Sequence, residues 1–320
     1  ITSEKFGVSR QSVHRFFSKL VKEGALTAEG NTRTRKYRLK PTLEKTFDFN
    51  VSKDLKEDTF WRQNILPLLK DLKPNVLEIC NYGFTEILNN VIEHSESGSG
   101  FTDLKIYPNR VEIGVTDFGV GIFRKIAREL NLEDERHAVL ELTKGKLTTD
   151  KAHHSGEGIF FASRMFDDFR IMSGTLVFSH TQGNEDNWLL QDEKEVQGTV
   201  VRMMIYKNSN RSLNKVFDEY ASKEGDFTFN KTHVPVALAK YGNEQLVSRS
   251  QAKRLLARLE PFKEVFLDFK GVDSIGQAFA HEIFRVYRNE HPGIRITWTN
   301  TSPTVENMIK RAQAGTLGAD

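Results

Sequence analysis

The chain has few of the residues that hold small extracellular proteins together. Its 320 residues include one cysteine, Cys80, which excludes an intramolecular disulfide framework and a zinc site built from several thiolates. No apolar run approaches the ~20 residues of a membrane span, and no hydrophobic segment of a signal peptide is present. These absences predict a soluble, cytoplasmic protein of a reducing compartment that does not bind membranes.

Length and charge indicate several modules. A chain of 320 residues predicts two or three domains. The net charge of +3 hides an asymmetry, because residues 1–40 carry ten lysines and arginines against three acids, a net charge of +7. A small basic module on an acidic body is typical of a nucleic-acid-binding head. The first residue is Ile1 rather than methionine, so we expect a truncated N-terminus.

The basic segment has the pattern of two short helices and a hairpin. Ser9 can cap a helix that ends at Gly24, with an apolar stripe formed by Val13, Phe16, Phe17, Leu20 and Val21. A basic strand over 34–39 follows a turn near Gly30. Residues 6–39 resemble the winged helix-turn-helix of bacterial transcription regulators, which implies DNA binding and a homodimer on a two-fold site.

Two interpretations of this head stay open. In the first, residues near the start of the second helix contact DNA base edges, and the arginines of the hairpin contact phosphates. The expected DNA-binding residues are Arg10, Gln11, Ser12, Arg15, Arg33 and Arg35. In the second interpretation the winged helix binds another protein, and its basic face is only solvated. Residues 41–74 are predicted to be a linker with a connecting strand, followed by a helix over 54–72 in which Pro67 marks a kink or boundary.

The middle of the chain carries polar residues at helical spacing and two glycine-rich turns. Glu86, Asn89, Asn90 and Glu93 share one face of a predicted helix. Asp117 ends the alternating strand 110–117, directly before Gly119 and Gly121. A second glycine-rich turn opens another amphipathic helix at residue 158, and such a turn presents free N–H groups to phosphate.

Together, in this order, these motifs resemble the ATP-binding domain shared by gyrase, Hsp90, histidine kinases and MutL, over residues 75–208. The resemblance implies ATP and Mg²⁺ as ligands. It makes Glu86 a general base, Asn90 the magnesium ligand and Asp117 the acceptor for the adenine amino group. The remaining expected nucleotide-binding residues are Asn89, Gly119, Gly121, Ser155, Gly156, Glu157, Gly158 and Thr199.

The segment between the glycine turns, 123–154, corresponds to a mobile lid in that family. Lys144 or Lys146 could neutralise phosphate charge there, or both could be solvated. His153 and His154 are open to a metal-site interpretation, or to one as loop histidines near phosphate. The short length and the box ILNNVIEHS are most similar to the anti-sigma-factor serine kinases, which implies a sigma or anti-sigma-type protein partner.

Residues 226–320 alternate strands and helices, which predicts a small α/β domain. The segment VFLDFKGVDSIGQAFAHEIF resembles the STAS fold of anti-sigma-factor antagonists. That resemblance makes Ser274 a phosphoacceptor, whereas the local pattern is equally that of a helix N-cap. Asp-Ser-Ile-Gly stands here where antagonists usually have Asp-Ser-Ser-Gly.

The expected fold class is therefore α+β multidomain: a winged helix, a Bergerat-type α/β sandwich ATPase and a STAS-like domain. The leading functional hypothesis is an ATP-switched, DNA-binding transcription regulator. Two alternatives are a serine kinase that phosphorylates its own or a partner's STAS domain, and an ATP-gated dimerising clamp with slow ATPase activity.

Overall fold

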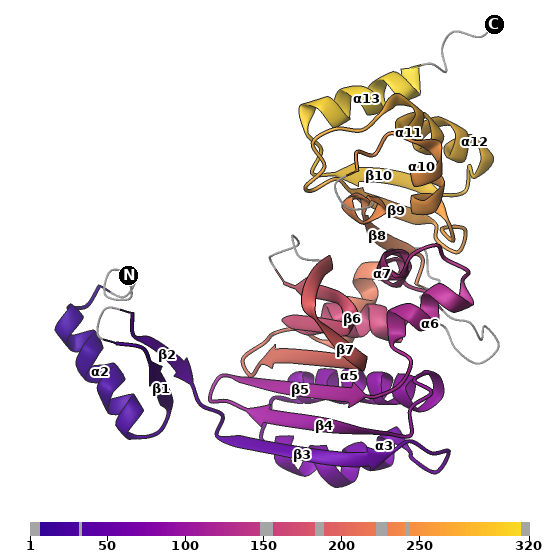
Figure 1. Cartoon of the computed structure of the whole chain (residues 1–320). Coiled ribbons are helices and arrows are strands. Elements are labelled where there is room, and N and C mark those ends of the chain that lie inside the picture. Colours follow the sequence, from indigo (N-terminus) through magenta and orange to yellow (C-terminus); the bar gives the residue numbers. More distant parts are fainter. Residues whose placement is uncertain are drawn as a thin grey trace, which may run out of the picture.

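The computed structural model describes residues 7–31, 34–147, 156–182, 189–221, 229–240 and 244–314. The chain is α+β, and the strands of the described residues form three sheets (Figure 1). We call residues 7–40 the head, 43–221 the central domain and 229–314 the C-terminal domain. Among the residues described, no helix is both long and apolar enough to cross a membrane.

The described residues of the head form one helix and one hairpin. Its elements are α2 (Arg10–Lys22), β1 (Leu26–Glu29) and β2 (Lys36–Leu39). The predicted N-cap is confirmed, because the Ser9 hydroxyl accepts a hydrogen bond from the backbone N–H of Ser12 at 3.1 Å. The strands pair antiparallel, and the ring of Phe17 packs edge-on against Tyr37 with centroids 4.6 Å apart.

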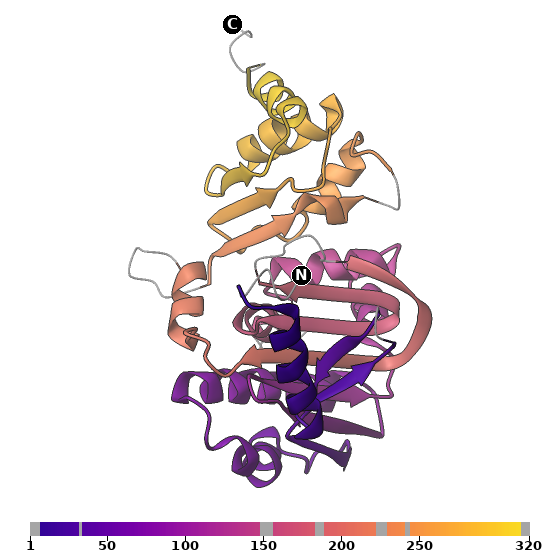
Figure 2. The same ribbon diagram turned by 90° about the vertical axis from the view of Figure 1, so that its left-hand side faces the viewer.

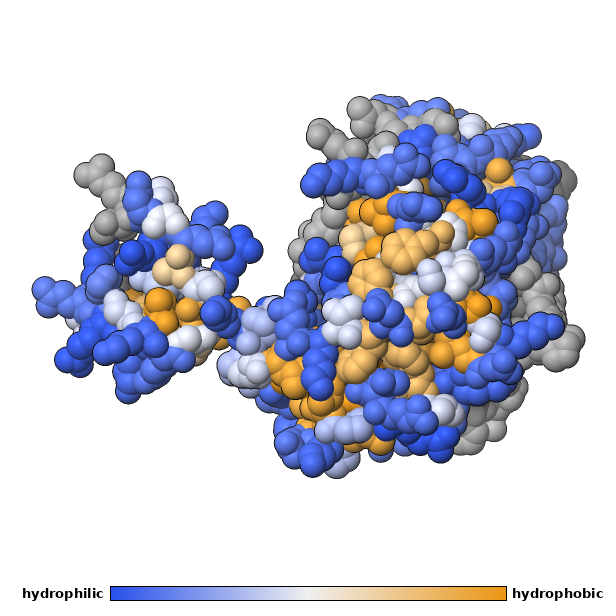
Figure 3. All heavy atoms as spheres, turned by 60° about the horizontal axis from the view of Figure 1, so that its bottom comes forward, coloured by the Kyte–Doolittle hydropathy of each residue, from blue (hydrophilic) through white to orange (hydrophobic). Residues whose placement is uncertain are grey.

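The expected buried stripe on this helix is wrong. No residue of α2 is buried, and Phe16 is 58% exposed. The described part of the head supplies only the small hairpin to cover the helix, so little apolar surface leaves water. Figures 1 and 3 show the head as a separate lobe, mostly hydrophilic on its surface, joined to the body by a narrow connection.

The central domain is built on a five-stranded antiparallel sheet in the order β3-β4-β5-β7-β6. The strands are β3 (Leu43–Asn50), β4 (Ser99–Ile106), β5 (Arg110–Asp117), β6 (Asp168–Thr181) and β7 (Leu189–Tyr206). The predicted strand over 110–117 is confirmed, with Val111, Ile113 and Val115 buried. The strand predicted at the start of the segment 41–74 is β3, which pairs along its full length with β4 and forms an edge of this sheet.

Helices cover one face of this sheet. The long helix α5 (Pro74–His94) contacts β5 and β7 through a buried apolar face, and α8 (Gly158–Met165) contacts β6. α9 (Leu213–Tyr220) packs against both helices. The helix predicted over 54–72 is present as one continuous run over 57–69, made of α3 (Glu57–Phe60), the π-helical turn η1 (Trp61–Ile65) and α4 (Leu66–Leu69). Pro67 lies in the first turn of α4, directly after the π-helical turn, so the local geometry changes where the proline lacks an N–H.

Two further helices stand between the central sheet and the C-terminal domain. These are α6 (Ile122–Glu129) and α7 (Glu135–Lys144). Figures 1 and 2 both show the C-terminal domain stacked on the end of the central domain that carries them. All residues of α7 from His137 to Lys144 are buried, so this helix belongs to the core between two domains.

The C-terminal domain has a three-stranded parallel sheet in the order β10-β9-β8. Its strands and short helices are β8 (Lys231–Pro235), η2 (Val236–Ala239), α10 (Arg249–Leu256), β9 (Glu264–Asp268), α11 (Gln277–His281), η3 (Glu282–Tyr287), α12 (Arg288–Glu290), β10 (Arg295–Thr299) and α13 (Pro303–Ala314). The predicted alternation of strands and helices is confirmed from β8 onward. Its core is fully buried and apolar, as at Leu255, Leu267, Phe279 and Ile309.

Candidate functional site

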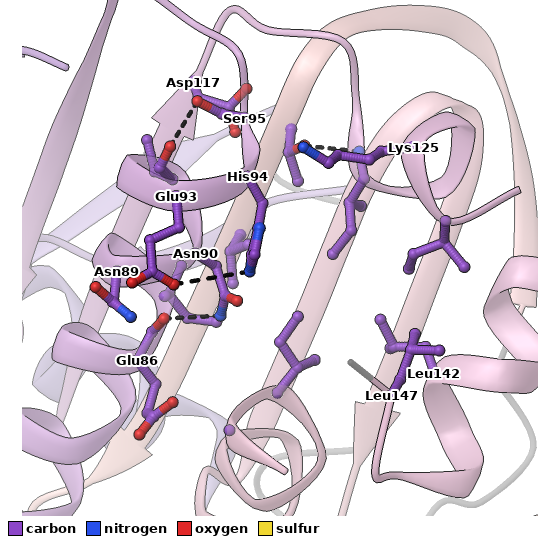
Figure 4. Close-up of a pocket in the computed structure, with 18 of the residues that line it drawn as sticks. Glu86, Asn89, Asn90, Glu93, His94, Ser95, Asp117, Lys125, Leu142 and Leu147 are labelled. Carbon is purple, nitrogen blue, oxygen red and sulfur yellow. Dashed lines mark hydrogen bonds and ion pairs between the residues drawn. The ribbon is translucent and has the colours of Figure 1, made fainter. Parts of the chain in front are cut away.

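A cavity of about 340 Å³ opens between α5, the end of β5, the interior of β7, α6 and the start of α8. Its volume lies within the ~300–1,000 Å³ of small-molecule sites. Figure 4 shows the polar side chains of α5 on one side, with Leu142 and Leu147 across the cavity from them. The sequence-predicted residues that line it are Glu86, Asn89, Asn90, Asp117, Gly121, Gly156, Gly158 and Thr199.

Helix α5 supplies one polar side of the cavity. Glu86, Asn89, Asn90 and Glu93 are spaced so that they share one face, while Ile87, Leu88 and Val91 are buried. The side-chain N–H of Asn90 donates to the Glu86 carbonyl at 2.7 Å. That bond turns the Asn90 side-chain oxygen toward the cavity (Figure 4), where it is available as a ligand.

Asp117 is a buried carboxylate at the end of β5. Its Oδ1 accepts a hydrogen bond from the Gly119 N–H at 2.9 Å. Burial raises the pKa of Asp117 above its ordinary value, and hydrogen bonds from Gly119 and Thr199 only partly offset this effect. A carboxylate held in this way is a strong acceptor for a donor on a ligand.

The turn after Asp117 is held against the end of α5. The Val120 N–H donates to the Ser95 carbonyl at 3.0 Å. A Cβ on Gly119 would collide with that same carbonyl oxygen, and Gly121 has a φ of +85°. Side chains are therefore excluded at both positions, as predicted for a tight turn. Gly119 itself lines a neighbouring hollow rather than the main cavity.

The second glycine-rich turn meets α5 directly. Gly156 accepts a backbone hydrogen bond from Leu147 at 3.1 Å. A Cβ on Gly158 would overlap the carboxylate of Glu86, so glycine lets the start of α8 approach the predicted general base. Glu157 is the N-cap of α8 without a side-chain capping bond. Ser155, His153 and His154 lie outside the described residues.

The two lysines of the predicted lid do not line the cavity, and the interpretation of Lys144 as solvated is wrong. Lys144 is 1% exposed, and its Nζ donates to the carbonyls of Ala257 at 2.7 Å and Arg254 at 3.3 Å. The Nζ of Lys146 donates to the Pro261 carbonyl at 3.4 Å. Both side chains are turned to the C-terminal domain rather than to the cavity, and Lys146 stays partly exposed.

The cavity has a lysine that the sequence reasoning missed. Lys125 on α6 lines it, and its Nζ lies 3.3 Å from Glu96 and 3.6 Å from Glu129. The i,i+4 spacing of Lys125 and Glu129 was a signal for the pair, but nothing in the sequence directs it to a cavity. The acidic residues among those lining the cavity are Glu86, Glu93, Asp117 and Glu129.

These acids do not form a metal site by themselves. Among the residues that the structure describes, no three His, Cys, Asp or Glu side chains gather in a way that would hold a metal ion. His94 pairs with Glu93, with Nε2 and Oε2 3.8 Å apart.

The head presents most of its predicted contact residues to solvent. Arg10, Gln11, Ser12 and Arg15 are exposed along α2, and Arg35 is exposed just before β2. The Ser12 hydroxyl lies 2.9 Å from the Ser9 hydroxyl and takes part in the helix cap. Arg33 lies outside the described residues.

Ser274 lies in the loop between β9 and α11 and is half-buried. The interpretation as an N-cap is wrong, because the N-cap of α11 is Gly276, without a side-chain bond. The Ser274 side chain makes no hydrogen bond or ion pair with other described residues. Its hydroxyl is therefore not committed to holding the helix.

Comparison with known proteins bears on the C-terminal domain. Residues 251–306 match the family model described as a STAS-like domain of unknown function (DUF4325). This range runs from α10 to the first turn of α13, so the C-terminal α/β domain is STAS-like. No curated protein matches the chain.

The raised pKa of Asp117 predicts a pH dependence of stability. Between the unfolded value of 3.8 and the higher folded pKa, the folded state holds the proton more tightly. Stability from this group is therefore present at low pH and is lost as pH rises through the folded pKa. Relative to Asp117→Asn, which does not titrate, the wild type should gain free energy of unfolding between about pH 7 and about pH 4.

Urea unfolding of both proteins across this range measures the difference, and all other titrating groups cancel in the comparison. A free energy of unfolding that rises with pH in the wild type relative to Asp117→Asn would contradict the raised pKa of Asp117.

Proposed function

We propose that the central domain binds ATP with Mg²⁺ in the cavity, and that the chain is an ATP-dependent, DNA-binding transcription regulator. One observation carries the proposal. Motif residues from α5, the end of β5, the start of α8 and β7 line a single cavity of nucleotide size. Chance motifs in a sequence have no reason to converge in space, whereas the ATP-binding domain of gyrase, Hsp90, histidine kinases and MutL requires this convergence.

The ends of the cavity suit the two ends of a nucleotide. Asp117 is a buried acceptor at the end of β5, suited to an adenine amino group. Gly156 and Gly158 bring the start of α8 close to α5, where the free N–H groups of a helix N-terminus favour phosphate. The nucleotide would therefore lie with its adenine at the end of β5 and its phosphates at the start of α8.

The acidic lining favours a nucleotide that carries its own cation. Four carboxylates and one lysine would repel a free triphosphate. Mg²⁺ usually binds through few protein oxygens together with substrate phosphates, and the Asn90 oxygen that faces the cavity fits that role. Glu86 would then stand beside the phosphates as a base for water or a hydroxyl.

Binding of Mg-ATP tests the site. Asp117→Asn sets an amide donor against the adenine amino group and should weaken binding by about 1.5–3 kcal/mol, the value of a hydrogen bond to a charged group. Glu86→Ala should retain binding but lose phosphate release. Titration calorimetry and a phosphate-release assay on the same samples measure both quantities.

Asp103→Asn is the matched control, since Asp103 is also buried in the sheet but pairs with Arg202 away from the cavity. Equal affinity of Asp117→Asn and wild type, or a wild type that does not bind Mg-ATP, would overturn the proposal.

The head supports DNA binding through charge and shape. Its helix starts with exposed Arg10 and Arg15, and the strand β2 adds Lys36 and Arg38. A helix with a polar, basic N-terminal half beside a basic hairpin is suited to the major groove and the adjoining phosphates.

Electrophoretic mobility shift with and without Mg-ATP tests the regulator. Arg10→Ala and Arg15→Ala should each weaken binding by about 1–3 kcal/mol, and Mg-ATP should change the affinity of the wild type. Arg288→Ala, which alters an exposed arginine of the C-terminal domain, should bind like wild type. Affinity that is the same with and without Mg-ATP would remove the switch from the proposal.

The serine-kinase function is a second candidate, favoured by the uncommitted Ser274 hydroxyl. Transfer of the γ-phosphate to this oxygen would add almost two negative charges beside α11. Incubation with γ-labelled ATP and mass spectrometry should then find label at Ser274 in the wild type and none in Ser274→Ala. Equal labelling of both proteins would rule this candidate out.

A further inference from the structure

Helix α7 belongs to the cavity and to the interface with the C-terminal domain at the same time. Leu142, near its end, and Leu147, just after it, line the cavity. The same helix contacts β8 and η2 of the C-terminal domain, and the Thr232 hydroxyl donates to the Lys144 carbonyl at 2.7 Å. A movement of α7 would therefore change both the cavity and the interface with the C-terminal domain.

A buried charge network fastens α7 to α10. Lys144 and Glu141 are 1% and 3% exposed, and the Lys144 Nζ lies 2.8 Å from the Glu141 carboxylate. The two other hydrogen bonds of Nζ go to the carbonyls of Arg254 and Ala257, at the C-terminal end of α10. Lysine thus neutralises a buried acid and also caps a helix end that carries partial negative charge.

An arginine from the C-terminal domain completes the network. The Arg258 Nη1 lies 3.4 Å from Glu141, and its residue has a φ of +59°. A non-glycine residue in this region is strained and persists only where its surroundings hold it. Arg254 adds a longer contact to Glu133, 3.8 Å, in the segment before α7.

Aromatic packing is a second connection between the cavity and the C-terminal domain. Phe160, on the first turn of α8, lines the cavity and packs against Phe229 with ring centroids 4.6 Å apart. Phe229 in turn packs against Phe262 of the C-terminal domain at 5.3 Å. The Lys146 ammonium lies over the last two of these rings, 5.4 Å from the centroid of Phe229 and 5.3 Å from that of Phe262.

We propose that the C-terminal domain is a built-in clamp on the nucleotide cavity, which holds α7 and the Leu142–Leu147 segment against it. Docking of this domain and nucleotide binding then favour each other. This inference rests on the proposed ATP site. Because coupling between two sites is reciprocal, Mg-ATP should also tighten the contact of α10 with α7.

Two variants of the full chain loosen the clamp without touching the cavity lining. Lys144→Met removes the central cation but keeps an unbranched apolar chain of similar length. Arg258→Gln removes only the outer arginine, which is 39% exposed, and is the milder change. Arg249→Gln is the control, because Arg249 is exposed on the same helix α10 and makes no ion pair with described residues. The thiol of Cys80 serves as a control for folding. Because this residue is buried in α5, it should stay unreactive toward thiol reagents in every variant that folds.

The first measurement needs no nucleotide. Amide hydrogen exchange over 142–147 and 254–258 should be faster in Lys144→Met and Arg258→Gln than in wild type or Arg249→Gln. Unchanged exchange in both clamp variants would overturn the inference, whatever the outcome for ATP.

The second measurement is the affinity for Mg-ATP. Lys144→Met should bind about 5–150-fold more weakly than wild type, the usual range of coupling between sites, and Arg258→Gln should show a smaller loss in the same direction. In wild type, Mg-ATP should slow exchange over 254–258. Wild-type affinity in both variants would also overturn the clamp. A wild type that does not bind Mg-ATP would instead remove the proposed ATP site, and the clamp would then be decided by exchange alone.

Discussion

The pairing of β5 with β7 is the constraint on which the cavity depends. Their register sets Asp117 opposite Thr199, and the Thr199 hydroxyl accepts the Ile122 N–H at 3.0 Å. The turn between Asp117 and α6 is therefore anchored at both ends. A slip of one residue in this antiparallel pair would turn Asp117 to the other face of the sheet, and neither α5 nor α8 would have a carboxylate to face.

Helix α7 shows how a charged residue can belong to a core. Lys144 and Glu141 lose almost all contact with water, which is costly for each charge alone. Burial lowers the pKa of Lys144, and the adjacent Glu141 carboxylate opposes that shift. The pair is retained because the lysine meets an acid and two helix-end carbonyls at once. The result is an interface that is specific to one arrangement of the two domains.

Local patterns predicted much of this molecule. The polar face of α5, the alternation in β5 and the βα order of the C-terminal domain follow from side-chain periodicity, which is a property of neighbouring residues. The predictions that failed depend on whether a distant segment of the chain covers an apolar surface. Phe16 belongs to a helical apolar pattern, yet it is 58% exposed because no element among the described residues covers it.

The sequence by itself determined the local features of this protein: the glycine turns, the Ser9 cap, the polar helix face and the STAS-like pattern of the last domain. Only the tertiary structure decided that these features share a cavity and that Lys144 faces away from it. The physical reason is burial. The partner that desolvates Lys144 lies 113 residues along the chain at Ala257, and no local pattern records which surface a distant domain will cover.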